Sequence, residues 1–164
     1  MDLTPVAHLA AIKGKVPFIN FFDGFRTSHE IQKIEKWDYA DLKEMCNMDA
    51  VKAFREHALN PEHPAMRGSH ENGDVFFQHR EACNSVYEAL PAVVKKYMGK
   101  INEKLGTNYD LFNYYGAEDA DRVIIAMGSI CDVAEEVIDY LTAKGEKVGL
   151  IKVRYIVLGY LLHY

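Results

Sequence analysis

The chain has 164 residues, of which 49% are apolar and 26% are charged, and this composition is enough for one or two globular domains with a proper core. It excludes an intrinsically disordered protein, a collagen and a disulfide-rich miniprotein. The formal net charge of −5, with no run of Lys and Arg, provides no basic surface for a polyphosphate backbone, so no nucleic acid is expected as a partner.

The N-terminal region predicts a short helix followed by a strand. Thr4 before Pro5 is typical of a capped helix start, and Gly14 is a suitable helix end. Residues 16–22 then form an apolar and aromatic run, which predicts a strand buried on both faces. The polar residues 27–30 predict a turn or another helix start.

Between residues 37 and 59, apolar side chains recur at helical spacing. Asp38 and Asp49 are placed to cap two short helices in this region. Residues 60–74 follow with two prolines, two glycines and two histidines, which is the composition of a loop. This loop is the expected boundary between two structural parts of the chain.

A long helix is predicted over residues 76–105. Pro91 removes a backbone donor and is expected to kink or divide this helix, and Gly106 is expected to end it. The aromatic group at residues 111–115 comes next. It could stack a base or another ring, although packing between domains is the more common role of such a cluster.

The last part of the chain predicts a strand, a helix and a second strand. Residues 122–127 form a short apolar run typical of a buried strand, and residues 132–143 carry a helical apolar stripe. Ser129 and Asp132 are spaced as a weak capping pair for this helix. A strand at residues 147–153 follows at a distance that suits a right-handed parallel crossover, so the region begins like a Rossmann-type βαβ unit.

Histidines and carboxylates gather in and around the central loop and could supply metal ligands. They are His57, Glu62, His63, His70, Glu71, Asp74 and His79. No two of these histidines lie one helical turn apart, so their spacing does not predict convergence on one ion. A solvated loop or an interface loop is the favoured interpretation.

Two further candidates lie at the predicted strand-to-helix turn. Gly128 and Ser129 could direct backbone N–H groups and a helix dipole at an anion, but the second and third glycines of a dinucleotide motif are missing, so an ordinary turn is favoured. Cys131, in the first helical turn, could be a nucleophile of lowered pKa. A buried core cysteine is the favoured alternative.

The cysteines indicate the compartment of the protein. Cys46, Cys83 and Cys131 are odd in number and far apart, which suits a reducing environment, and no secretory signal is recognisable, so a cytoplasmic protein is expected. At no familiar spacing could they bind an iron–sulfur cluster among themselves. The longest uncharged apolar stretch, residues 155–164, is too short to cross a membrane, and no membrane partner is expected.

Several long motifs carry a resemblance to a known family. They are VPFINFFDGFRTSHE at residues 16–30, LNPEHP at residues 59–64, RGSHEN at residues 67–72, LFNYYGA at residues 111–117 and ADRVIIAMGSIC at residues 120–131. Together they closely resemble pyruvate:ferredoxin (flavodoxin) oxidoreductases, and the likeness extends over about residues 1–154.

The resemblance implies an α/β fragment from the interior of a homodimeric enzyme several times this length. Residues 1–30 would be the C-terminal part of domain I, the pyrimidine-binding-like, thiamine-type domain. Residues 31–117 would be a mainly helical connection. Residues 118–154 would be the start of domain II, contributing the first βαβ unit of a transketolase C-terminal-like, Rossmann-type fold.

The resemblance also implies the chemistry of the parent enzyme, which is the oxidative decarboxylation of pyruvate to acetyl-CoA. The family uses thiamine diphosphate, Mg and Fe₄S₄ clusters, takes coenzyme A as a substrate, and passes electrons to ferredoxin or flavodoxin. The family motifs for pyruvate, metal, diphosphate and clusters lie outside the matched region. No catalytic, cofactor-binding or metal-ligating residue is therefore assigned, and the fragment is expected to be inactive without the rest of the parent chain.

Two expectations complete the interpretation. The alternative to an enzyme fragment is a stand-alone α/β module that binds a nucleotide or coenzyme A at the turn of Gly128 and Ser129, without catalysis. Residues 155–164 depart abruptly from the family pattern. The loss of one base after the codon of Arg154 would generate Tyr155 and the three residues that follow, so this tail is expected to be out of frame.

Overall fold

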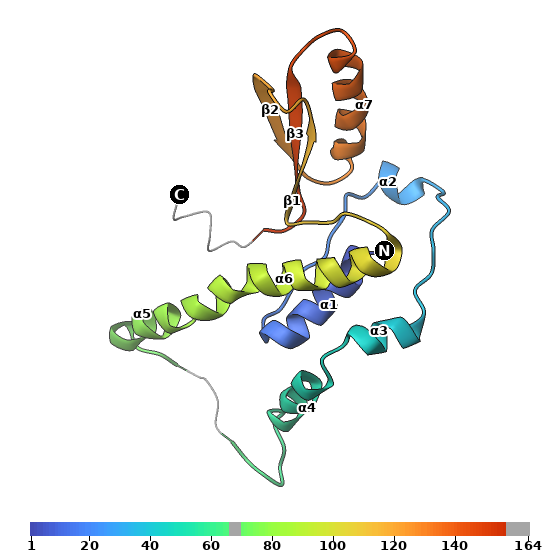
Figure 1. Ribbon diagram of the computed structural model, residues 1–164. Helices are drawn as coiled ribbons and strands as arrows, with labels where there is room; N and C mark the ends of the chain where they lie inside the picture. Colours follow the sequence, from blue (N-terminus) through green and yellow to red (C-terminus); the bar gives the residue numbers. More distant parts are fainter. Residues whose placement is uncertain (66–69, 157–164) are drawn as a thin grey trace.

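The computed structural model describes residues 1–65 and 70–156 (Figure 1). The helices are α1 (Leu3–Gly14), α2 (Arg26–His29), α3 (Tyr39–Met45), α4 (Met48–Glu56), α5 (Gly73–Ala82), α6 (Asn84–Leu105) and α7 (Ile130–Thr142). The strands are β1 (Phe112–Gly116), β2 (Arg122–Ala126) and β3 (Val148–Val153). The chain is thus a mixed α/β protein, as the sequence predicts. None of the helices in the described ranges is both long and apolar enough to span a membrane.

The helical body is built on α6, with α1 packed along it (Figure 1). Apolar residues at helical spacing on both helices meet there, and Met45 at the end of α3 joins them. The buried core residues are Val6, Leu9, Ala10, Met45, Val94, Tyr97, Met98 and Ile101. Ile101 and Ala10 are completely removed from solvent, and the cluster is larger than the second buried cluster, around Leu150, so it is the main core of the described residues.

Helix α1 ends at Gly14, as expected, but its start and the conformation that follows it differ from the expectation. Thr4 lies inside the helix and its hydroxyl accepts a hydrogen bond of 2.7 Å from the Asn20 side-chain amide, so it is not the cap. Lys15, with φ of 56°, takes the left-handed position after the helix. Gly14 serves a different purpose, because a Cβ there would lie 2.6 Å from Cδ2 of Leu90 on α6. The glycine allows the two helices to approach closely.

The strand predicted over residues 16–22 is absent from the structure. The segment has no regular secondary structure and pairs with no strand in the described ranges, and Ile19, Phe21 and Phe22 are 86%, 69% and 74% exposed. An apolar run indicates a need for burial without indicating what buries it. The neighbouring expectation at residues 27–30 is confirmed by α2.

The two short helices after residue 37 form as predicted, with one change of cap. The Asp38 carboxylate accepts a hydrogen bond of 2.9 Å from the Ala40 amide at the start of α3. At the start of α4 the cap is Asn47, whose side-chain oxygen accepts from the Ala50 amide at 2.9 Å. Asp49 is instead in the first turn, where a negative charge still favours the helix N-terminus.

The long predicted helix is divided at Cys83 and not at Pro91. Cys83 ends α5 and starts α6 in a tight turn, in which its amide donates to the Arg80 carbonyl and its own carbonyl accepts from the Val86 amide. Pro91 lies inside α6, which continues because its buried face packs on α1. Gly106 ends α6 in the left-handed conformation, as predicted.

The second unit, termed the α/β unit, is a three-stranded sheet in the order β1-β3-β2 with α7 against one face (Figure 1). Strands β2 and β3 are parallel, which confirms the predicted strand–helix–strand connection. Strand β1 pairs antiparallel with β3 and has no counterpart among the predicted strands. The expectation that β2 is buried is wrong: it lies at a sheet edge, where Ile124 and Ile125 are 58% and 71% exposed.

Candidate functional site

The histidines of the central loop do not converge. His57, His63, His70 and His79 are all exposed. Nδ1 of His79 lies 2.5 Å from a carboxylate oxygen of Glu71, and Nδ1 of His57 lies 2.6 Å from a backbone carbonyl of its own helix. In residues 1–65 and 70–156 no three His, Cys, Asp or Glu side chains come together as a metal site.

The turn of Gly128 and Ser129 follows β2, and the carboxylate of Asp23 lies against it. The Ser129 backbone amide donates to Oδ1 of Asp23 at 3.2 Å, and the Ser129 hydroxyl donates to Oδ2. The Thr27 hydroxyl also donates to Oδ2, at 2.8 Å. These hydrogen bonds, that of the Ser129 hydroxyl first, lower the pKa of the Asp23 carboxyl to about 2.

The capping role expected for Ser129 is therefore changed, and the place of the alternative anion site is occupied. Ser129 is the N-cap residue of α7, but its side chain makes no capping bond to the helix, because it donates to Asp23. An acceptor carboxylate from a segment 106 residues away takes the position that an anion would occupy. The sequence shows Asp23 only as part of an Asp-Gly turn, and nothing in its local pattern points to Ser129.

Cys131 belongs to the core of the α/β unit. It is 8% exposed and packs with Ile138 and Leu150. Burial is the largest influence on its thiol and raises its pKa, which is opposite to the change that an activated nucleophile requires. The structure therefore supports the core interpretation of this cysteine.

The aromatic group at residues 111–115 is mostly strand β1. Tyr115 packs against the core of the α/β unit, and its hydroxyl donates to Asp139 on α7 at 2.7 Å. Phe112 and Tyr114 alternate with it and are 58% and 48% exposed. Part of the cluster therefore packs within the unit, and Phe112 and Tyr114 leave an apolar surface open.

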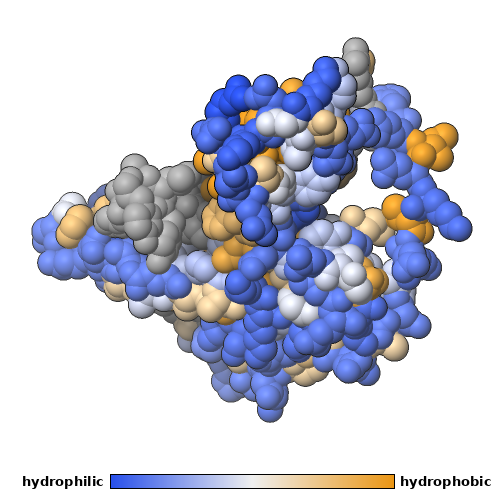
Figure 2. Space-filling view, turned by 45° about the horizontal axis from the view of Figure 1, so that its top comes forward, coloured by the Kyte–Doolittle hydropathy of each residue, from blue (hydrophilic) through white to orange (hydrophobic). Residues whose placement is uncertain are grey.

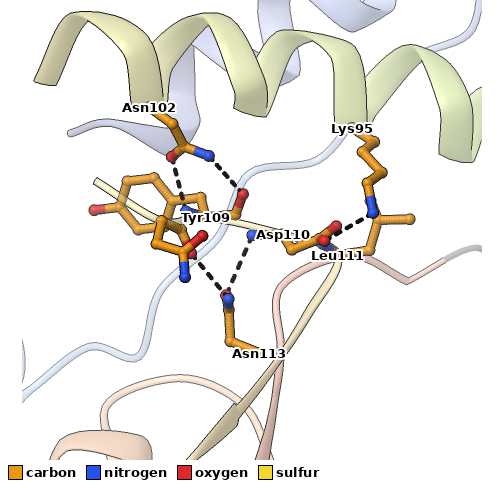
Figure 3. Close-up of polar contacts among 7 residues, drawn as sticks. Lys95, Asn102, Tyr109, Asp110, Leu111 and Asn113 are labelled. Carbon is orange, nitrogen blue, oxygen red and sulfur yellow. Dashed lines mark hydrogen bonds and ion pairs between the residues drawn. The ribbon is translucent and has the colours of Figure 1, made fainter. Parts of the chain in front are cut away.

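The most elaborate polar cluster joins α6 to β1, and Figure 3 shows it. The Asn102 side chain binds both backbone groups of Tyr109: its oxygen accepts from the amide at 2.7 Å, and its amide donates to the carbonyl at 2.8 Å. The Thr107 hydroxyl donates to the same oxygen at 2.9 Å. Asn102 thus closes the turn after α6. Sequence reasoning missed it, because a helical Asn gives no sign of a partner seven residues ahead.

Charged side chains also connect α6 with β1 at this junction. Lys95 on α6 donates to Asp110 at 2.8 Å and lowers the pKa of that carboxyl. Asn113 on β1 accepts from the Asp110 amide at 3.2 Å (Figure 3). It also accepts from the Arg154 side chain at 3.0 Å. These groups bind one another, so the cluster is structural and has no acid–base pair free for chemistry.

One apolar cleft of about 610 Å³ lies between α1 and residues 36–48. Its titratable lining side chains are His8, Lys36, Tyr39, Lys43 and Cys46. Among the described residues, no carboxylate lines this cleft.

Comparison with protein-family models gives two matches. Residues 1–99 match the model described as "Pyruvate flavodoxin/ferredoxin oxidoreductase, thiamine diP-bdg". Residues 120–157 match the model described as "Pyruvate:ferredoxin oxidoreductase core domain II". The two matches fall on the helical body and on the α/β unit.

Curated relatives match nearly all of the chain. It is 61% identical over 153 residues to a pyruvate-flavodoxin oxidoreductase of Enterobacter agglomerans, with 93% of this chain and 13% of the relative covered. It is 56% identical over 154 residues to a pyruvate:ferredoxin oxidoreductase of Moorella thermoacetica, covering 94% and 13%. A pyruvate dehydrogenase (NADP+) of Cryptosporidium parvum is 49% identical over 155 residues, covering 94% and 8%. The chain thus spans about an eighth of the length of the first two relatives.

Proposed function

Because this chain belongs to the pyruvate flavodoxin/ferredoxin oxidoreductase family, we propose that it is a segment of an enzyme that oxidatively decarboxylates pyruvate to acetyl-CoA and passes the electrons to flavodoxin or ferredoxin. The high identity to such enzymes over nearly the whole chain carries the proposal. The activity is proposed for the longer enzyme. This segment is expected to have no activity by itself.

The exposed surface supports the proposal that other parts of an enzyme cover this chain. Its accessible surface is 13087 Å², whereas a compact monomer of 18.7 kDa exposes about 8,300 Å². Large apolar side chains contribute to the excess, including Ile19, Phe21, Phe22, Phe25 and Ile31. Figure 2 shows one face on which apolar patches interrupt a mainly hydrophilic surface. Such patches are typical of surfaces that contact further protein.

The proposal also includes the domain organisation. Residues 1–30 are assigned to the end of domain I, residues 31–117 to a mainly helical connection, and residues 118–154 to the start of a transketolase C-terminal-like, Rossmann-type domain II. The parallel β2–α7–β3 connection supports the last assignment. In residues 155–164, which we propose to be out of frame, only Tyr155 and Ile156 fall within the described residues. We further propose a homodimeric parent in the cytoplasm, and the three free cysteines are consistent with that compartment.

The residues present do not fit the family's cofactors, so no catalytic step is assigned to them. Thiamine diphosphate is held through a divalent cation, which requires several oxygen ligands, and the described residues bring no such set together. At the N-terminus of α7, the Asp23 carboxylate would repel a diphosphate. A family Fe₄S₄ cluster requires four cysteines, and the cysteines of this chain lie on separate elements. The same carboxylate argues against a stand-alone module that binds a nucleotide or coenzyme A at this turn.

A chimeric enzyme tests the proposed function. Residues 1–154 would replace the matching segment of the Enterobacter agglomerans relative, and pyruvate-dependent and coenzyme A-dependent reduction of flavodoxin would be measured. We expect activity comparable to that of the unmodified relative, because 61% identity preserves the core and the contacts that the segment makes. The isolated chain, assayed in parallel, should be inactive. A chimera that folds and binds its cofactors but does not turn over would contradict the proposal.

The isolated chain is expected to bind neither thiamine diphosphate nor an iron–sulfur cluster. Calorimetric titration with thiamine diphosphate and Mg²⁺ should show no heat of binding, and anaerobic reconstitution should leave the protein colourless. The unmodified relative, treated identically, provides the positive control. The reason for this expectation is that Cys46, Cys83 and Cys131 cannot supply four ligands. Brown cluster absorbance at stoichiometric iron in the isolated chain would refute it.

A further inference from the structure

Residues 16–25, termed the strap, run from the end of α1 to the α/β unit (Figure 1). The strap has no partner strand in the described ranges, yet it contacts the α/β unit at two places. The ring of Phe18 stacks on that of Tyr155, just after β3, with centroids 6.1 Å apart. Tyr155 belongs to the tail proposed to be out of frame, so this contact is not expected in the longer enzyme. The carboxylate of Asp23 binds Ser129, just after β2.

Both contacts lie at the carboxyl edge of the sheet, where the parallel strands β2 and β3 end. Because β2 and β3 are parallel, Ser129 and Tyr155 follow the carboxyl ends of neighbouring strands. In open α/β sheets this edge is where ligands usually bind. In this chain a segment of the protein itself lies across it.

Asp23 is chemically suited to the end of α7. The first amides of a helix have no acceptor within the helix, and an oxygen placed before them satisfies one amide and interacts favourably with the helix dipole. Ser129 does not provide this oxygen from its own side chain. Asp23 does, while it also accepts from the hydroxyls of Ser129 and Thr27. Its lowered pKa is consistent with these bonds.

We propose that Asp23 is the N-terminal cap of α7, supplied from a distant segment, and that this contact holds the strap across the carboxyl edge of the sheet. Asp23 is then a positioning residue with no chemical step of its own. The α/β unit is attached to the helical body at two places, through the strap and through the junction of Asn102 with Tyr109. One chain connection between the units would allow rotation, and a second attachment restricts it.

Amide hydrogen exchange, measured residue by residue by NMR on the full chain, tests the proposal. Replacement Asp23→Ala should raise the exchange rate of the Ser129 amide about tenfold, because a lost helix cap opens the first turn. It should also lower the heteronuclear NOE of residues 19–24, since the strap loses one of its two contacts. Asp23→Asn, which keeps an acceptor oxygen, should restore much of the protection.

The matched control is Thr27→Ala. Thr27 also donates to Asp23 but lies four residues away in the same region of the chain, so its loss leaves the contact with α7 in place. Its Ser129 amide should exchange within about twofold of the wild-type rate. The proposal is overturned if Asp23→Ala keeps the wild-type dispersion of amide signals and leaves Ser129 protected. It is overturned equally if Thr27→Ala has the larger effect.

Discussion

Replacement Ile101→Ala is expected to lower the free energy of unfolding by about 3 kcal/mol, a substantial share of the stability of a small protein. Ile101 is 0% exposed and lies on the face of α6 that packs on α1. Removing most of its side chain loses the transfer free energy of the deleted groups and leaves a cavity between the helices, which can close only partially. Urea unfolding followed by circular dichroism at 222 nm measures the difference.

Ile31→Ala is the matched control for this deletion. The same atoms are removed from a fully exposed isoleucine, so the free energy of unfolding should change by less than about 0.5 kcal/mol. The comparison separates the loss of core packing from any effect of isoleucine on the unfolded chain. If the two variants were equally destabilised, Ile101 would not lie in the core of the helical body.

Gly116→Ala is expected to destabilise the α/β unit by about 3 kcal/mol, through strain and not through a cavity. Gly116 has φ of 117°, a conformation that residues with a side chain rarely adopt. A Cβ there would also lie 2.5 Å from the Val148 carbonyl oxygen and 2.9 Å from Cα of Gly149. Both neighbours are backbone atoms of β3 and cannot rotate away, so β1 would have to separate locally from β3. Hydrogen exchange of the β1 and β3 amides reports the change directly.

Gly99→Ala provides the opposite case. Gly99 is inside α6, and apart from its chain neighbours and the adjacent backbone of the helix, no heavy atom of the described residues lies within 4 Å of a Cβ built there. Alanine is the better helix former, so this variant should gain about 0.5–1 kcal/mol in the free energy of unfolding. A destabilised Gly99→Ala, or a neutral Gly116→Ala, would contradict the backbone conformations assigned to these glycines.

Elements with local signals could be predicted from the sequence. The end of α6 follows from Gly106, because glycine accommodates the left-handed position cheaply. The parallel pairing of β2 with β3 follows from two apolar runs separated by one amphipathic helix. The cap of α3 at Asp38 could also be predicted, because the cap and the helix are adjacent in the chain.

Features that depend on distant partners could not be predicted. Residues 16–22 are as apolar as a buried strand, but pairing needs a second strand, and the described residues do not supply one. Strand β1 was missed for a related reason: its partner β3 lies more than thirty residues later, and the aromatic run of β1 resembles any packing cluster. The contact of Asp23 with Ser129 spans 106 residues, so no spacing rule could identify it.

The position of β3 in the sheet has a consequence for biosynthesis. Among the described residues it is the last of three strands in sequence, but it lies between the other two in the sheet. Chains emerge from the ribosome N-terminus first, so α1 and α6 are both available early, whereas β1 and β2 have no partner until residue 153 has been made. A translational pause in α7 would therefore expose two unpaired strands, one of which carries Ile124 and Ile125. Coding sequence that is translated quickly between residues 127 and 153 would shorten the period in which the nascent chain can aggregate through these strands.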